Sequence, residues 1–110
     1  MSFTVESNGD VTVVEVAGEL IVGNRQEFKQ GVLESLDQKA TRFVIDFTNC
    51  GYIDSSGLGV LVTLSKKIRE RGGELRLAGL NEDLLVLMEL TRLDTLFNIS
   101  DSRAEALQGF

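Results

Sequence analysis

The sequence has 110 residues, of which 43% are hydrophobic and 25% charged, a balance typical of one soluble globular domain with a single core. The net charge of −6 disfavours nucleic acid and anionic membranes as partners, because both are densely negative. Histidine is absent, which removes the usual general base at neutral pH, the commonest metal ligand and the central member of a serine triad. We therefore expect no cofactor and no metal, and most classes of enzyme are excluded.

The chain carries no sign of export or membrane insertion. No apolar stretch approaches the roughly 20 residues that a membrane-spanning helix needs, and the N-terminus lacks the basic and apolar regions of a secretory signal. The single cysteine, Cys50, can form neither an internal disulfide nor a multi-thiolate metal site. We therefore expect its small side chain to be buried in the core. We predict a cytoplasmic protein in which residues 1–110 form one domain.

The first strands are predicted from alternating and β-branched residues. Residues 3–7 and 11–16 carry this pattern on either side of Asn8-Gly9-Asp10, which suits a tight antiparallel hairpin. Residues 42–47 form an almost wholly apolar run, which is typical of a strand buried on both faces of a parallel sheet. We expect this run to lie at the centre of the sheet, with a loop over 48–54 after it.

Helices and strands then alternate along the chain. Asn24, with Glu27 three positions later, is predicted to cap the first helix, and Asn81 is predicted to cap the third. The third helix carries a dense apolar set that we expect to cover the sheet, namely Leu84, Leu85, Leu87, Met88 and Leu90. Helices are predicted over 25–38, 56–71 and 82–90 and from Ser102 onward, and further strands over 74–78 and 96–99.

The order β-β-α-β-α-β-α-β-α predicts an α/β fold whose central sheet is mixed but mostly parallel, with the N-terminal antiparallel hairpin at one edge. In such sheets, functional loops gather where a strand ends and a helix begins. Residues 54–59 (Asp-Ser-Ser-Gly-Leu-Gly) occupy such a place. Ser55 or Ser56 should open the second helix, where free N–H groups and the helix dipole favour an anion such as phosphate. The simpler alternative is that Asp54, Ser55 or Ser56 merely caps this helix.

Residues 44–47 (Val-Ile-Asp-Phe) and 52–61 (Tyr-Ile-Asp-Ser-Ser-Gly-Leu-Gly-Val-Leu) resemble the signature of STAS-domain anti-sigma-factor antagonists. The resemblance extends to residues 18–20, 72–75 and 93–99 and so covers essentially the whole chain. It implies a STAS fold and a non-enzymatic role. In that family the unmodified antagonist binds an anti-sigma factor, usually also a serine kinase, and thereby frees the sigma factor. Phosphorylation ends the binding, and a protein serine phosphatase restores it.

The resemblance also implies the site. The modified hydroxyl of the family directly follows the Asp, which makes Ser55 the implied phosphorylation site here. Many relatives carry Asp after Gly-Glu-Leu, whereas this chain has Ile21, which could form an apolar partner surface with Val22. The predicted partner-binding residues are Glu19, Ile21, Asp54, Ser55, Ser56, Gly57, Leu58 and Gly59.

Other functions remain as alternatives. The chain could be a structural subunit without a phosphate switch, resembling the small STAS component of lipid-transport ATPase complexes. An enzyme acting through Ser55 or Asp54 lacks a catalytic base, and the two glycines at 57 and 59 are only a weak phosphate-loop pattern. Asp46 and Asp54 could be imagined as a metal or phospho-acceptor pair, but an Asp at the end of a strand is more often a hydrogen-bonded loop anchor.

Overall fold

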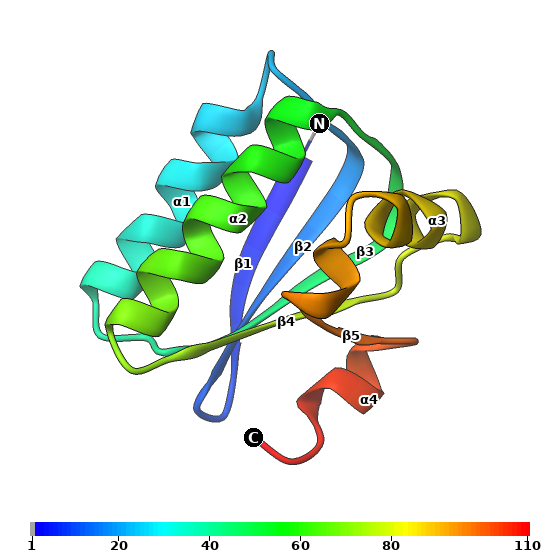
Figure 1. Cartoon of the computed structure of the whole chain (residues 1–110). Helices are drawn as coiled ribbons and strands as arrows, with labels where there is room; N and C mark the ends of the chain where they lie inside the picture. The colour runs from blue at the N-terminus through cyan, green and yellow to red at the C-terminus, as the bar shows by residue number, and fades with distance from the viewer. Residues whose placement is uncertain (1) are drawn as a thin grey trace.

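The protein is described by a computed structural model that covers residues 2–110 (Figure 1). Within this range the order of elements is the one the sequence predicts. The strands are β1 (Ser2–Asn8), β2 (Val11–Leu20), β3 (Arg42–Ile53), β4 (Glu74–Ala78) and β5 (Asn98–Ser100). The α-helices are α1 (Arg25–Asp37), α2 (Ser55–Glu70), α3 (Glu82–Leu90) and α4 (Arg103–Leu107), and a short 3₁₀ turn, η1 (Leu93–Thr95), precedes β5.

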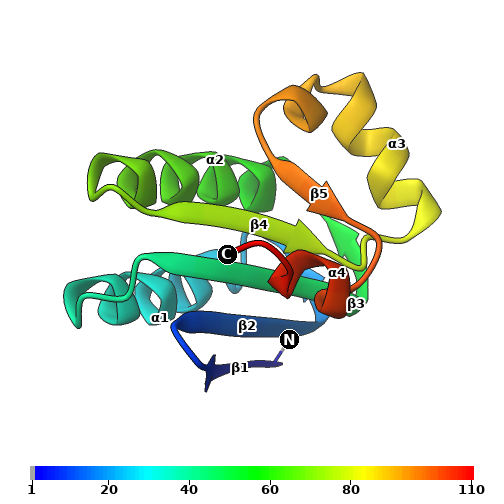
Figure 2. The same cartoon turned by 90° about the horizontal axis from the view of Figure 1, so that it is seen from below.

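The strands form one sheet in the order β1-β2-β3-β4-β5. β1 pairs with β2 in the antiparallel direction through the hairpin, and the other neighbours are parallel, as Figure 2 shows. The mixed, mostly parallel α/β sheet predicted from the sequence is therefore confirmed. β3 lies at its centre, as the apolar run over 42–47 predicts.

The two faces of the sheet are covered unequally. In β3 the side chains of Phe43, Ile45 and Phe47 enter a large core beneath α1, α2 and α3, because alternate residues of a strand point to the same face. Val44 points the other way, into a small cluster under α4 with Ala106. Figures 1 and 2 show α1 and α2 side by side on one face and the short α4 on the other. Cys50 is buried, as predicted.

β2 and β3 are both longer than the sequence pattern predicts. We expected strands to end at residues 16 and 47, with a loop over 48–54, but pairing continues to Leu20↔Ile53. Two register shifts interrupt the ladder, between Glu15 and Ala17 and between Gly18 and Glu19. Such irregularities break the alternation of side chains, so the sequence pattern no longer reads as a strand. The extension carries Glu19 and Leu20 to the end of β3, where the candidate site lies.

Two smaller expectations are also corrected. β5 covers Asn98–Ser100 rather than 96–99, because residues 96 and 97 still form the turn after η1, where the N–H of Phe97 donates to the carbonyl of Leu93. In α3, Leu84 and Met88 are buried, but Leu90 is 78% exposed. At about 100° per residue, Leu90 lies about 160° around the helix from the buried Met88.

Arg103 of α4 holds the second face together. Its Nε donates to Asp46 Oδ2 at 2.8 Å, and its two Nη atoms donate to Glu6 and Glu15 at 2.7 Å each. These three carboxylates come from β3, β1 and β2. Asp46 Oδ1 accepts hydrogen bonds from the N–H and the hydroxyl of Thr48, so its expected role as a hydrogen-bonded anchor is confirmed. One guanidinium thus joins α4 to three strands.

Replacing Arg103 with glutamine should lower the free energy of unfolding by about 1–3 kcal/mol, because the carboxylate of Asp46 stays buried and loses its cation. The side chain of Asp46 is only 7% exposed. Arg71→Gln is the matched control, since its pair with Asp37 leaves the two side chains 56% and 70% exposed and should contribute less than about 1 kcal/mol. Urea denaturation measures both, and equal losses would contradict this account.

Asp46 should also make stability depend on pH. Burial raises the pKa of this carboxyl, but the hydrogen bonds from Thr48 and the charge of Arg103 outweigh burial, so its pKa in the folded protein is lowered. A lowered pKa means a stabilisation that is complete above the unfolded value of about 4 and is lost as pH falls through the folded pKa. Between about pH 4 and pH 2 the wild type should lose stability more steeply than Asp46→Asn. The measurement is the free energy of unfolding, from urea denaturation at several pH values. If it depends on pH equally in both proteins, this role of Asp46 is excluded.

Candidate functional site

The candidate site lies where β2 and β3 end side by side. The last pair of the ladder joins Leu20 to Ile53, and the N–H of Asp54 then donates to the carbonyl of Leu20 at 3.1 Å. α2 begins one residue later, at Ser55. Figure 1 shows that α1 and α2 start at the same end of the sheet. The β2–α1 loop and the start of α2 therefore form one continuous surface.

Asp54 connects these two segments. Its Oδ1 accepts the N–H of Gly57 at 2.9 Å and so caps α2, and its Oδ2 accepts the N–H of Val22 at 3.0 Å. The hydrogen bond from Gly57 is the main reason that the pKa of Asp54 is lowered, with that from Val22 adding to it. Both oxygens are thus occupied within the protein. Asp54 is the helix cap that the simpler interpretation predicted, and it leaves the hydroxyl of Ser55 outside the capping arrangement.

Asn24 stabilises the β2–α1 loop in a way that the sequence did not predict. We expected its side chain to cap α1 together with Glu27, but it makes no capping hydrogen bond. Its Oδ1 instead accepts the N–H of Ile21, and its Nδ2 donates to the carbonyl of Glu19, both at 3.0 Å. The loop folds back on itself before the helix starts, so the amide is used within the loop. This arrangement leaves Ile21 half-buried and Val22 62% exposed.

The predicted residues at the start of α2 divide into an exposed and a buried group. Ser55 and Gly59 are exposed, and Ser56 is half-buried. Gly57 and Leu58 are buried and support the surface from below. A Cβ at Gly57 would lie 2.6 Å from the carbonyl oxygen of Leu20, so the absence of a side chain allows α2 to pack against the end of β2. Ser55 is therefore exposed to solvent above this packed base.

Three features of this surface were not chosen from the sequence. Tyr52 follows a strand pattern but is 55% exposed beside Glu19, its partner in the ladder. Arg25 and Lys29 of α1 lie beside Ser55 in a groove between the two helices. Their spacing of four residues places both on one side of α1, and this is the signal that could have identified them.

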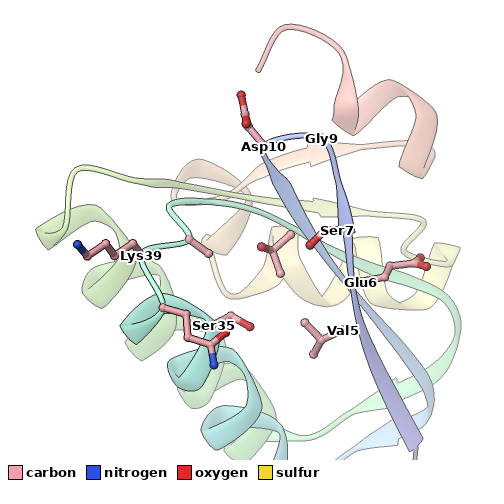
Figure 3. A pocket seen from close by; sticks show the side chains of 10 residues that line it. Val5, Glu6, Ser7, Gly9, Asp10, Ser35 and Lys39 are labelled. Atoms are coloured by element: carbon pink, nitrogen blue, oxygen red, sulfur yellow. The ribbon is translucent and has the colours of Figure 1, made fainter.

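A second hollow lies at the opposite end of the sheet, between β1 and the C-terminal end of α1 (Figure 3). Its lining includes small side chains such as Val5, Ser7 and Ser35. Near the other end of α1, Phe3 packs edge-on against Phe28 with ring centroids 5.9 Å apart, and comparably large rings are missing from this hollow. The hollow therefore lies where no aromatic ring fills the space between β1 and α1.

Among residues 2–110 there is no group of three or more His, Cys, Asp or Glu side chains that could hold a metal ion. Over the same range, no helix is both long enough and apolar enough to cross a membrane.

The topology and the helix start at Asp54-Ser55 define an α/β domain in which the exposed Ser55 follows the end of the central strand. This chain belongs to the STAS domain family, whose model matches residues 2–106. It is 33% identical over 100 residues to the anti-sigma-B factor antagonist of Listeria monocytogenes, covering 91% of this chain and 88% of that protein. It is 32% identical over 96 residues to the anti-sigma-B factor antagonist of Bacillus subtilis, covering 87% of each.

A solved structure confirms the fold. The crystal structure of a candidate anti-sigma factor antagonist from Thermotoga maritima matches with a TM-score of 0.92 and 30% identity, over 96% of this chain and 92% of that one. The resemblance to the STAS family inferred from the sequence motifs is therefore confirmed, as is the predicted fold class.

The two glycines of α2 should respond oppositely to alanine. Gly57→Ala places a methyl group against Leu20 and Ile53 and should destabilise the protein by about 1–3 kcal/mol. Gly59→Ala meets no atom within 4 Å and should stabilise it by up to about 1 kcal/mol, because alanine is the better helix former. Chemical denaturation of the pair tests this packing, and a Gly57→Ala protein as stable as the wild type would show that α2 does not pack this closely.

Proposed function

We propose that this chain is an anti-sigma-factor antagonist. In its unmodified form it binds an anti-sigma factor, which is also a serine kinase, and so frees a sigma factor in the cytoplasm. Phosphorylation of Ser55 ends the binding, and a protein serine phosphatase restores it. The chain acts as ligand and substrate rather than as an enzyme, and residues 1–110 act as one domain.

The observation that carries this proposal is the exposed hydroxyl of Ser55 at the first position of α2, directly after the cap Asp54. The names of the Listeria monocytogenes and Bacillus subtilis relatives support the identity of the partner. Around Ser55, the exposed side chains of Val22 and Tyr52 supply apolar area that a partner can bury. Glu19, Ile21, Ser56 and Gly59 complete the proposed docking surface, with Gly57 and Leu58 beneath it.

The switch is electrostatic. The oxygen of Ser55 attacks the γ-phosphorus of ATP held by the kinase, an O–P bond forms, ADP leaves, and the hydroxyl proton passes to a base of the kinase. The phosphate adds a charge of about −1.5 to −2 at pH 7 at a place where partner binding removes water. Desolvating a dianion beside the carboxylate of Asp54 weakens the complex. In the reverse step, catalysed by the phosphatase, water attacks the phosphorus, the P–O bond to Ser55 breaks, inorganic phosphate leaves, and the serine oxygen takes up a proton to regenerate the hydroxyl.

The kinase should distinguish two adjacent hydroxyls. With the cognate anti-sigma factor and ATP, wild type and Ser56→Ala should each gain one phosphate and lose binding, whereas Ser55→Ala should gain none and stay bound. Asp54 already caps α2, so Ser55→Ala should change the free energy of unfolding by less than about 0.5 kcal/mol. Intact-mass spectrometry and a pull-down measure these outcomes.

A Ser55→Asp protein should bind more weakly than wild type but more tightly than the phosphorylated form, because one carboxylate has less charge than phosphate. Unchanged binding of both Ser55 variants and of the ATP-treated wild type would refute the switch. Stable co-purification with a transporter ATPase, without any phosphate on Ser55, would favour the structural-subunit alternative.

A further inference from the structure

Two cations of α1 lie across a groove from Ser55. The α1–α2 groove is lined by Arg25, Gln26, Lys29, Ser55, Ser56, Gly59, Val60 and Thr63. The α2 members recur at spacings of three and four residues, so they form the side of α2 that faces α1. The groove thus brings the serine hydroxyls of one helix together with the positive charges of the other.

One of these cations stands where a helix normally carries an acid. Arg25 is the first residue of α1 and Lys29 lies one turn later. The positive end of the helix dipole disfavours a cation in the first turn, so Arg25 is opposed by its own helix. A residue that breaks a local rule of this kind is a candidate for a role in function.

Neither cation forms an ion pair within residues 2–110. In the same range, the Nε of Arg25 is buried without any hydrogen-bond acceptor. Asp54 is the nearby acid and attracts Arg25 electrostatically, but it forms no ion pair with it, and both of its oxygens already accept backbone N–H groups. The two positive charges are therefore available to another anion.

The groove also has room for an anion. A Cβ at Gly59 would meet no heavy atom within 4 Å, so this part of the groove is open. The hydroxyl of Thr63 donates to the carbonyl of Gly59 within its own helix at 3.0 Å, and it does not bridge to α1. No side chain therefore fills the groove at Gly59, one helical turn after Ser55, and a phosphate attached to Ser55 can approach α1 there.

We propose that Arg25 and Lys29 together bind the phosphate of phosphorylated Ser55 across the α1–α2 groove, an inference that rests on the proposed modification of this serine. The guanidinium offers N–H donors in a planar fork that matches phosphate oxygens, and the ammonium adds a second charge. The phosphate then ties the start of α2 to the start of α1. Phosphorylation both adds negative charge to the docking surface and occupies the two cations that the unmodified surface presents.

The test measures the second pKa of the phosphate, using protein in which phosphoserine is incorporated at position 55 during synthesis, so that no kinase is needed. Two neighbouring cations favour the dianion, so in the wild type this pKa should lie below the ordinary value of about 6. In Arg25→Gln/Lys29→Gln it should rise by about half a unit to one unit. A titration followed by phosphorus NMR gives both values.

Lys66→Gln/Lys67→Gln is the matched control, because it removes the same charge from the far end of α2. Residue 66 lies 11 positions from Ser55, which is about 16 Å along the helix, beyond the screening length of about 8 Å in physiological salt. The control should titrate like the wild type. Circular dichroism of each unmodified variant confirms its fold, and Lys29→Gln alone should give about half of the shift, which keeps the test valid if the double variant fails to fold.

The inference is wrong if the second pKa of the phosphate is the same in the wild type and in Arg25→Gln/Lys29→Gln. It is also wrong if both double variants shift this pKa equally. Neither outcome depends on the activity of a kinase. The proposed function fails separately, if the anti-sigma factor binds the phosphoserine protein as tightly as the unmodified one. A lowered pKa with unchanged partner binding would therefore support the groove and refute the switch.

Discussion

The carboxylate of Asp54 is the interaction on which the functional end of the molecule depends. Its two oxygens accept N–H groups from Gly57 and from Val22, which lie on opposite sides of Asp54 in the chain, the second of them 32 residues away. One side chain therefore sets both where α2 begins and where the β2–α1 loop lies. The close approach of Gly57 to Leu20 adds a steric constraint to the same joint. Asp54 thus fixes the position of Ser55, because both of its carboxylate oxygens accept backbone hydrogen bonds.

Local charge matters more than net charge in this protein. The chain carries −6 overall, and on the α4 face Arg103 is surrounded by three carboxylates from three strands. At the start of α1, by contrast, Arg25 and Lys29 form no ion pair within residues 2–110. The first arrangement uses charge to hold an element in place. The second leaves charge available beside an exposed hydroxyl, where a phosphate would change it.

The differences between the predicted and the observed elements have a common cause. The extension of β2 and β3 was missed because bulges break the alternation on which strand prediction depends. Asn24 resembles a helix cap in sequence, but its amide bonds Ile21 and Glu19. Leu90 belongs to an apolar set, yet the rotation of α3 turns it to the solvent. In each case the chemical character of the residues was interpreted correctly, but the segment or solvent that they contact could not be predicted.

The sequence by itself determined the order of the elements, the buried central strand and the start of α2 beside Ser55, because hydrophobic periodicity and capping act over a few neighbouring residues. The motif at 54–59 likewise identifies the STAS family from the sequence alone. Only the tertiary structure decided that Asp54 holds Val22, that Arg103 collects its three carboxylates, and that Arg25 and Lys29 face Ser55. These contacts join residues that are far apart in the chain, and such residues come close only when the sheet has formed.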